Sequence, residues 1–206
     1  MQILTSWFSP AYPVGAFSYS HGLEWAIETG WVTDSATLEA WVADLLEHGA
    51  GWSDAILMAH AHAVADPGPL AELAEALAAS SERQLETMAQ GAAFARTTSA
   101  VWEIDVPAVA YPVAVGHAAG QLGLPLPALL TLHLQAFAAN IISAGVRLIP
   151  LGQTAGQQIT AHLLPLAARV AAAAEKSSLD DIGGMTIHAD MASMWHETQY
   201  TRLYRS

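Results

Sequence analysis

Residues 34–49, "DSATLEAWVADLLEHG", decide the fold class that this sequence predicts. Large apolar side chains recur here at spacings of three and four residues, which places them along one face of an α-helix. They are Leu38, Trp41, Val42, Leu45 and Leu46. Asp34 or Ser35 can cap the start of this helix, and Gly49 follows its end. The stretch therefore predicts an amphipathic helix over 35–48 that packs its apolar face against other helices.

Helical patterns of this kind cover most of the remaining chain, with proline and glycine between them. The ranges expected to be helical are 53–65, a short segment from Pro69, 81–98 with Leu85, Met88 and Phe94 facing inward, a short segment within 106–127, 128–148, about 155–175 and a last helix of about ten residues before the C-terminus. No segment alternates between apolar and polar residues as a half-buried strand would. We therefore expect an all-α, single-domain bundle of about eight to ten helices over residues 1–206.

The composition indicates a globular protein that does not bind nucleic acid. Apolar residues make up 53% of the chain, which is enough for a sizeable core. The formal net charge is −12 and Lys176 is the only lysine, so the chain would repel phosphate backbones. The absence of cysteine excludes disulfides, thiol nucleophiles and cysteine-ligated metal sites, and it fits a cytoplasmic protein.

The most apolar stretch, residues 128–149, is long enough to span a membrane. Four polar residues interrupt it, and each would be costly in lipid. They are His133, Gln135, Asn140 and Arg147. The N-terminus also lacks the basic and apolar regions of a signal peptide. We therefore expect this stretch to be a buried helix of a cytoplasmic protein with no membrane partner.

The segment at 9–24, "SPAYPVGAFSYSHGLE", has the residue types of a catalytic triad without its geometry. Ser18, His21 and Glu24 would share one face of one helix, whereas a triad draws converging side chains from separate segments. The segment also lacks the G-x-S-x-G pattern of a nucleophile elbow. We predict no catalytic residue, and we expect the serines to act as caps for the following helix.

The histidine pair and the glycine run elsewhere in the chain do not form a predicted ligand site either. His60 and His62 would point to nearly opposite sides of a helix, so they cannot chelate one ion. Gly116, Gly120 and Gly123 lack the Lys-Ser/Thr ending of a phosphate loop and indicate close helix packing instead. We predict no dedicated metal site, while a transient nickel, copper or zinc site at an interface stays open.

The C-terminal segment "HETQYTRLYRS", residues 196–206, has the composition of a binding hot spot. Tyrosine and arginine dominate such sites, and this segment holds two of each together with a leucine. Two interpretations stay open: the segment docks onto a partner, or Tyr200 and Leu203 pack back onto the domain. The seven tryptophans of the chain also indicate that some aromatic side chains lie at interfaces.

Three motifs, in this order, make the chain similar to the UreF family of urease accessory proteins. The segment at 9–24 resembles the N-terminal signature of that family, "VRLIPLGQTAGQ" at 146–157 resembles its middle motif, and 196–206 resembles its closing motif. The resemblance covers nearly the whole chain. It implies an all-α protein that is not an enzyme, and a C-terminal docking tail over 195–206.

The resemblance also implies partners. Members of the UreF family dimerise and bind the accessory protein UreD, and together they recruit the nickel-carrying GTPase UreG and help to load nickel into apo-urease. No tightly bound cofactor is expected, because nickel is handled by the complex. We expect the helix at 128–148 to form the dimer surface.

Residue roles follow from the same motifs, position by position. Structural roles fall to Pro13, Gly15, Ser18, Ser20, Gly22, Glu24, Arg147, Pro150, Gly152 and Gln153. Partner binding falls to Phe17, Tyr19, His196, Glu197, Tyr200, Arg202, Leu203, Tyr204, Arg205 and Ser206. We expect Phe17 and Tyr19 to support the tail, although some relatives have a tyrosine where Phe17 stands.

Two other functions stay open within the same biology. An arginine supplied in trans raises GTP hydrolysis by about three to five orders of magnitude, so the chain would then regulate UreG. The candidate arginines are Arg83, Arg96, Arg147, Arg169, Arg202 and Arg205. Alternatively, the chain would be a nickel-binding conduit, which needs polar groups along an internal passage.

Overall fold

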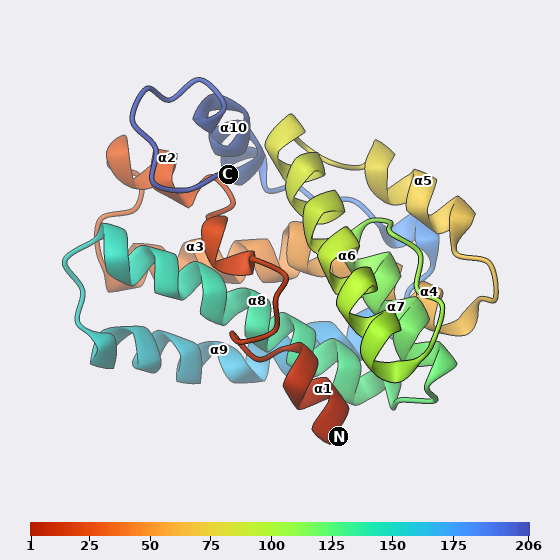
Figure 1. The fold of residues 1–206 in the computed structure, drawn as a ribbon. Coiled ribbons are helices and arrows are strands. Elements are labelled where there is room, and N and C mark those ends of the chain that lie inside the picture. Colours follow the sequence, from red (N-terminus) through yellow and green to blue (C-terminus); the bar gives the residue numbers. More distant parts are fainter.

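The computed structural model describes all residues from Met1 to Ser206 and contains helices but no strand (Figure 1). The α-helices are α1 (Gln2–Trp7), α2 (Leu23–Glu28), α3 (Ser35–His48), α4 (Ala50–Ala63), α5 (Gly68–Ala76), α6 (Ser81–Trp102), α7 (Tyr111–Gln121), α8 (Leu126–Leu148), α9 (Gln153–Ala174) and α10 (Ile187–His196). Two 3-10 turns, η1 (Ala16–Ser18) and η2 (Leu179–Asp181), complete the chain. The predicted all-α, single-domain bundle is confirmed.

The helix α3 begins and ends where its sequence predicts. The Asp34 side chain accepts a hydrogen bond from the Thr37 main-chain N–H at 2.9 Å, and the Thr37 hydroxyl reaches back to the N–H of Asp34. This capping box satisfies two donors that the first turn of a helix leaves free. All five apolar residues of the predicted stripe are buried.

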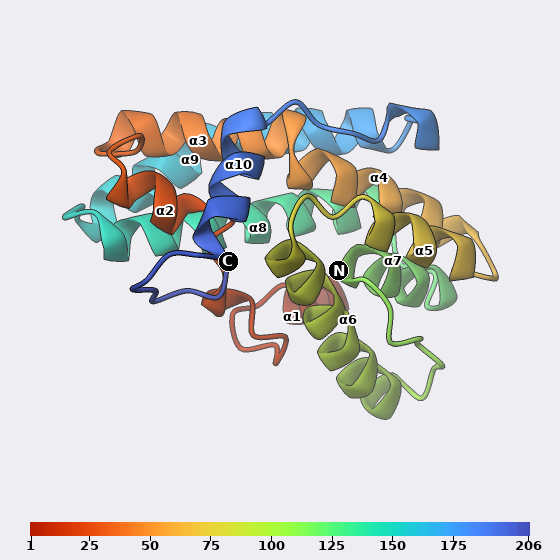
Figure 2. The same ribbon diagram turned by 90° about the horizontal axis from the view of Figure 1, so that it is seen from above.

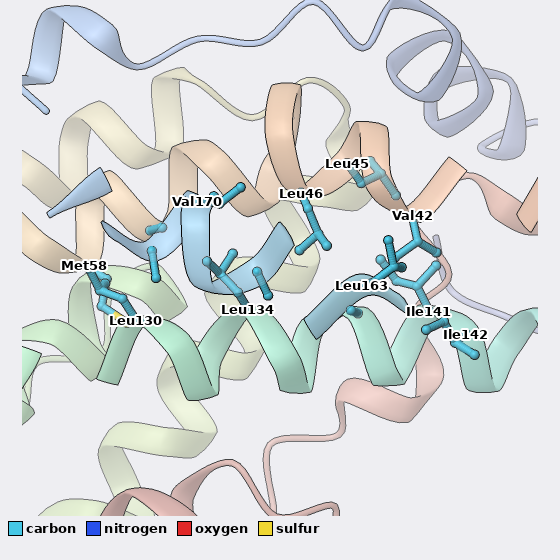
Figure 3. Packing of buried hydrophobic residues seen from close by; sticks show 14 of the residues in the cluster. Val42, Leu45, Leu46, Met58, Leu130, Leu134, Ile141, Ile142, Leu163 and Val170 are labelled. Carbon is cyan, nitrogen blue, oxygen red and sulfur yellow. The ribbon is translucent and has the colours of Figure 1, made fainter. Parts of the chain in front are cut away.

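The core forms around α8, which packs against α9, α3 and α4. Figure 3 shows Leu130 of α8 beside Met58 of α4, and Ile141 of α8 beside Leu163 of α9 and Val42 of α3. These side chains belong to one continuous cluster of 40 buried residues, so the bundle has one main core. By length and composition α8 would also pass as a membrane span, but such a signal is weak for a helix with half of its apolar window buried in protein.

The glycines of α7 allow close packing against α4, as predicted. A Cβ atom at Gly116 would lie 2.3 Å from the Met58 carbonyl oxygen, and one at Gly120 would lie 2.1 Å from that of His62. Gly123 differs, because it ends the helix with a positive φ and open space around it.

The inward face of α6 is the main difference from the predicted fold. Phe94 is buried and Met88 is half-buried, but Leu85 is exposed, so its predicted inward orientation is wrong. Polar residues, notably Glu82, Glu86 and Gln90, occupy the buried positions instead. These three recur every four residues, so they form a polar stripe along one face of the helix.

Several boundaries also differ from the predicted ranges. The helix α4 begins at Ala50 rather than at residue 53, because the chain turns once at Gly49 and continues directly from α3. The helix α6 continues to Trp102, four residues beyond the predicted end. The short helices α1 and α2 were not among the predicted ranges.

The C-terminal segment returns to the N-terminal third of the chain. Figures 1 and 2 show the segment after α10 looping past α2 and ending near the first turns of α6. Residues far apart in sequence therefore meet at this corner of the bundle.

Candidate functional site

The N-terminal signature forms a sharply turned loop between α1 and α2. Gly15 has a φ of 76° and starts η1, so it makes the turn that was predicted for Pro13 and Gly15. Gly22 has a φ of 72° at the start of α2, and a Cβ there would lie 2.7 Å from the Ser193 nitrogen of α10. Glycine at these two positions lets the loop turn and lets α2 contact α10.

The chain end pairs with this loop through main-chain hydrogen bonds. The Arg205 N–H donates to the Ser18 carbonyl at 2.8 Å, and the Ser20 N–H donates to the main-chain oxygen of Ser206 at 2.9 Å. The Ser20 hydroxyl also donates to that oxygen, and it accepts a bond from the Glu24 N–H at 3.3 Å. Ser20 thus supports the first turn of α2, while the helix cap itself is Gly22.

Glu24 is the main acceptor for the tail. Its carboxylate accepts from the main-chain N–H groups of Leu203 at 2.8 Å and Tyr204 at 2.9 Å. The same carboxylate lies 3.2 Å from Nε2 of His196, whose Nδ1 lies 2.7 Å from Glu82. Because carboxylates only accept, His196 satisfies both contacts when its imidazole carries two protons.

Glu82 and Glu86 extend this arrangement along α6. Glu82 accepts from the Arg202 guanidinium at 2.6 Å, which ties the tail to α6. Glu86 lies 3.1 Å from Nε2 of His21 and 3.6 Å from the Arg83 guanidinium. Burial alone would raise the pKa of the Glu86 carboxyl, but His21 and Arg83 outweigh burial and lower that pKa below its ordinary value.

We call these residues the polar junction: Ser20, His21, Glu24, Glu82, Glu86, His196 and Ser206. All of them are buried, and His196 has no exposed surface. Breaking a buried ion pair by removing one partner costs about 3–5 kcal/mol, because the remaining charge stays without compensation. The junction therefore couples the tail to α2 and α6 as one cooperative unit.

The tail buries some predicted binding residues and exposes others. Tyr204 and Ser206 are buried, whereas Tyr200 is fully exposed, and Leu203 and Arg205 also face solvent. Tyr200 and Leu203 do not pack back onto the domain, so that interpretation of the tail is wrong for these two side chains. The exposed residues are the types that make interface hot spots.

The other predicted binding residues of the first and last motifs are also partly buried and partly exposed. Phe17 is exposed and precedes Ser18, which pairs with Arg205 of the tail, while Tyr19 is buried. Glu197 accepts hydrogen bonds from the Ser81 N–H and hydroxyl at 2.8 and 2.7 Å, which caps α6 from the tail. The Ser81 hydroxyl and main chain lower the pKa of the Glu197 carboxyl, against a smaller opposing effect of burial.

The middle motif forms the connection from α8 to α9. Arg147 lies exposed in the last turn of α8, Pro150 follows that helix, and Gly152 and Gln153 start α9. No hydrogen bond or ion pair joins these residues to the tail.

The groups with the composition of a reactive or metal site hold structural contacts. His21 pairs with Glu86 and Glu24 pairs with His196, so Ser18, His21 and Glu24 do not converge. The Nε2 atoms of His60 and His62 lie 3.0 Å from the Ser177 carbonyl and 2.7 Å from the Leu124 carbonyl. No group of three or more His, Asp or Glu residues is arranged to hold a metal ion.

Sequence reasoning missed the α6 half of the junction. Glu82, Glu86 and Arg83 were not singled out for the tail, nor was Asp54, which lies 2.6 Å from Arg83. The signal was present as the polar stripe at four-residue spacing on α6. Such a stripe usually faces solvent, so only the tertiary structure shows that it is buried.

Comparisons with known proteins agree with this architecture. The sequence model of the UreF family matches residues 32–164. A protein of Cereibacter sphaeroides (strain KD131), named urease accessory protein UreF, is 53% identical over 98% of this chain and 97% of its own length. Proteins of the same name from Ruegeria pomeroyi and Rhodopseudomonas palustris (strain TIE-1) are 49% and 50% identical, over 100% and 98% of this chain and 97% and 91% of their own lengths.

Proposed function

The chain belongs to the UreF family of urease accessory proteins, and we propose that it is a dimeric cytoplasmic adaptor rather than an enzyme. In this proposal the chain binds UreD, and the two together recruit the GTPase UreG for nickel insertion into apo-urease. It acts by positioning its partners, and it holds no tightly bound cofactor.

One observation carries the proposal. The polar junction fixes the main chain of the tail, while Tyr200, Leu203 and Arg205 remain on the surface. Phe17 is exposed too, and it precedes Ser18, whose carbonyl accepts from the Arg205 N–H. An interface that is ordered before binding loses less conformational entropy on association. The tail is therefore built as a preformed docking element, and UreD is its proposed partner.

The dimer surface proposed here is the outer side of α8. Half of the most apolar window of this helix is buried in the bundle, and most of the remaining positions are half-buried. Ala139 and Ser143 lie on that outer side, one turn apart, and both are exposed. Small side chains of this kind allow two helices to approach closely.

The experiment that tests the adaptor is size-exclusion chromatography with light scattering. The chain is mixed with UreD, and then with UreG, GTP and nickel, beside a version that ends at Met194. We expect the full chain to assemble and the shortened chain to remain a dimer without partners. Equal assembly of both would show that the tail is not the docking element.

Arg202 gives a finer test of the tail. We expect Arg202→Ala to weaken assembly with UreD while leaving the helical content intact, because the ion pair with Glu82 holds the tail in place. Since its side chain is partly exposed, the loss of folding stability should be below about 1 kcal/mol. Normal assembly by this variant would count against a role of Arg202 in docking.

Regulation of GTP hydrolysis is a second candidate function, and the ion pairs narrow the candidate arginines. Arg83 and Arg202 pair with carboxylates at 2.6 Å, and Arg169 pairs with Glu47 at 3.8 Å. Arg96, Arg147 and Arg205 are exposed and have no ion pair. Only an unpaired arginine can enter the active site of another protein without first breaking a contact. GTP turnover by UreG should fall strongly with one of these three alanine variants if the chain supplies a finger, and it should change little with all three if the chain is a scaffold.

A nickel conduit is the third candidate, and two cavities favour it. One of about 500 Å³ lies between the 9–17 loop, α6 and α8, and one of about 130 Å³ lies between α4, α6 and α10. His21, Asp54 and Arg83 line both cavities. Titration with nickel tests this function: micromolar binding that is lost in His21→Ala supports a conduit, and the absence of binding argues against it.

A further inference from the structure

The larger of the two cavities lies between the 9–17 loop, α6 and α8, and we call it the α8 chamber. Its volume of about 500 Å³ falls within the range of roughly 300–1,000 Å³ that is typical of small-molecule sites. Five aromatic side chains line it: Trp7, Phe8, Tyr12, Tyr111 and Phe137. Aromatic rings pack well against other rings, edge to face or offset. The walls of the chamber therefore suit a ligand that is itself an aromatic ring.

His133 of α8 lies among these rings. The centroid of its imidazole is 5.9 Å from that of Phe8, 6.3 Å from that of Tyr111 and 6.4 Å from that of Phe137. The side chain lines the chamber and is only 4% exposed, and its Nε2 has no hydrogen-bond partner. Buried polar groups in folded proteins are nearly always paired. The chain supplies no partner for this nitrogen, and a ligand in the chamber can supply a hydrogen bond to the imidazole.

The buried charges of the chamber wall are already paired with one another. The Arg83 guanidinium lies 2.6 Å from Asp54 and 3.6 Å from Glu86. The same Glu86 lies 3.1 Å from His21. Arg147, the other charged residue of the wall, is exposed and stays in contact with water. A charged ligand would find no free counter-ion in the buried part of the chamber, so the site favours an uncharged one.

The two polar rings that face each other in the chamber are uncharged as well. Burial lowers the pKa of His133 to about 4, and it raises the pKa of Tyr111 above its ordinary value. A neutral imidazole has one nitrogen that donates a hydrogen bond and one that accepts. A hydroxyl group can do either, so it is the ligand group that matches both tautomers of His133.

We propose that the α8 chamber binds a small, uncharged aromatic molecule whose hydroxyl group forms a hydrogen bond with the His133 imidazole. The rings hold the ligand by apolar contact, and the hydroxyl gives the buried imidazole a partner. An apolar molecule of the same shape would leave that imidazole unpaired. This site goes beyond the proposed adaptor function, and its occupation does not depend on UreD. The 9–17 loop forms part of the wall, so binding should also stabilise this loop.

The test uses p-cresol and p-xylene, which have nearly the same shape and differ by a hydroxyl in place of a methyl group. Nuclear magnetic resonance titration measures the affinity of the purified full-length chain for each molecule near neutral pH. We expect p-cresol to bind with a dissociation constant of about 1 mM or lower, which is within reach of a ligand of this size. Amide exchange over 11–17 should become slower in its presence. Failure of p-cresol to bind would overturn the site.

His133→Phe tests the hydrogen bond, because phenylalanine keeps a flat ring and offers no polar partner. The dissociation constant of p-cresol relative to that of p-xylene should rise at least about fivefold in this variant. Comparing the two molecules cancels effects of the substitution on the shape of the chamber. An unchanged ratio would overturn recognition by His133.

Ala136→Phe tests the location. Ala136 is a half-buried residue of α8 that lines the chamber, so the larger side chain should weaken binding of both molecules at least about tenfold. Ala128→Phe is the matched control, since Ala128 is half-buried on the same helix but does not line the chamber. It should change both affinities by less than about twofold. Circular dichroism checks the fold of each variant. Binding that survives Ala136→Phe would place the ligand elsewhere and overturn the assignment.

Discussion

In the core around α8, Leu130, Leu134 and Ile141 are fully buried among aliphatic side chains, whereas in the polar junction His196 is just as buried between two carboxylates. Contacts in the core are numerous and do not depend strictly on direction, so the loss of one contact leaves many others that still hold the same residues together. Contacts in the junction are few and directional, so the loss of one leaves a buried polar group unpaired. The core therefore determines whether the chain folds, and the junction determines where its tail lies.

Leu134→Ala should have the largest effect on global stability. It removes a fully buried side chain from the middle of α8 and leaves a cavity, which costs about 2–5 kcal/mol. Urea denaturation measures this loss. Because the junction is untouched, the amides of the tail should stay protected from exchange relative to the rest of the variant. A selective loss of tail protection would contradict the separation of the two regions.

Acid should lower the free energy of unfolding through the buried core residue His133. Burial lowers the pKa of this imidazole from 6.5 to about 4, and its Nε2 has no hydrogen-bond partner. As the pH falls from 6.5 toward 4, the unfolded chain takes up a proton that the folded chain does not, so stability falls by up to about 3 kcal/mol. Urea denaturation at pH 7.5 and pH 4.5 shows this as a lower midpoint in acid.

His133→Phe is the control for this prediction. It should remove most of the acid loss over this range and leave stability at pH 7.5 nearly unchanged, since it replaces an unpaired polar ring by an apolar one. An unchanged acid loss would assign the effect to other groups. Glu86 responds at lower pH, because its lowered pKa preserves its contribution to stability until the pH falls below the ordinary value of 4.5.

Glu24→Gln should release the tail at a global cost of about 1–3 kcal/mol, below that of a fully broken buried ion pair, because His196 keeps its contact with Glu82. The carboxylate accepts from Leu203, Tyr204 and His196, and an amide has one oxygen to offer in its place. Hydrogen exchange read by mass spectrometry should show faster exchange over 197–206 and little change in α8. Glu47→Gln, an exposed carboxylate far from the tail in sequence, should show neither effect.

His162→Gln should have the smallest effect. His162 pairs with Glu39 at 3.1 Å, but both side chains are exposed, so the pair is screened by solvent. We expect a change below about 0.5 kcal/mol in the free energy of unfolding. A larger loss would indicate that exposed histidine–carboxylate pairs contribute more to this fold than their burial implies.

The sequence predicts the core far better than the junction. The five apolar residues of α3 repeat with helical spacing, and the glycines of α7 fix a close helix contact, so both follow from local pattern. The junction joins Glu24 to residues about 180 positions away, such as Tyr204, and such contacts leave no periodic signal. The polar stripe of α6 is typical of a solvent-exposed helix face, yet it is buried. Its burial depends on a tail that lies more than 100 residues downstream.

The family motifs predicted a relation between the two ends of the chain that hydrophobic periodicity does not reveal. They predicted that Phe17 and Tyr19 support the tail, and the structure joins the tail to the neighbouring Ser18 and Ser20 through main-chain hydrogen bonds. They did not distinguish the buried residues Tyr204 and Ser206 from the exposed Tyr200 and Leu203. Side-chain direction in an irregular segment depends on its partners, and half of those partners lie on α6.

The most direct test of this account is amide hydrogen exchange at Leu203 and Tyr204 in the isolated full-length chain. Both amides donate to Glu24 in the junction. We predict that they exchange at least about a hundredfold more slowly than unstructured peptide, and that Glu24→Gln removes most of this protection. Exchange at the unstructured rate in the unaltered chain would show that the tail is not held in the isolated chain, and it would contradict a preformed docking element.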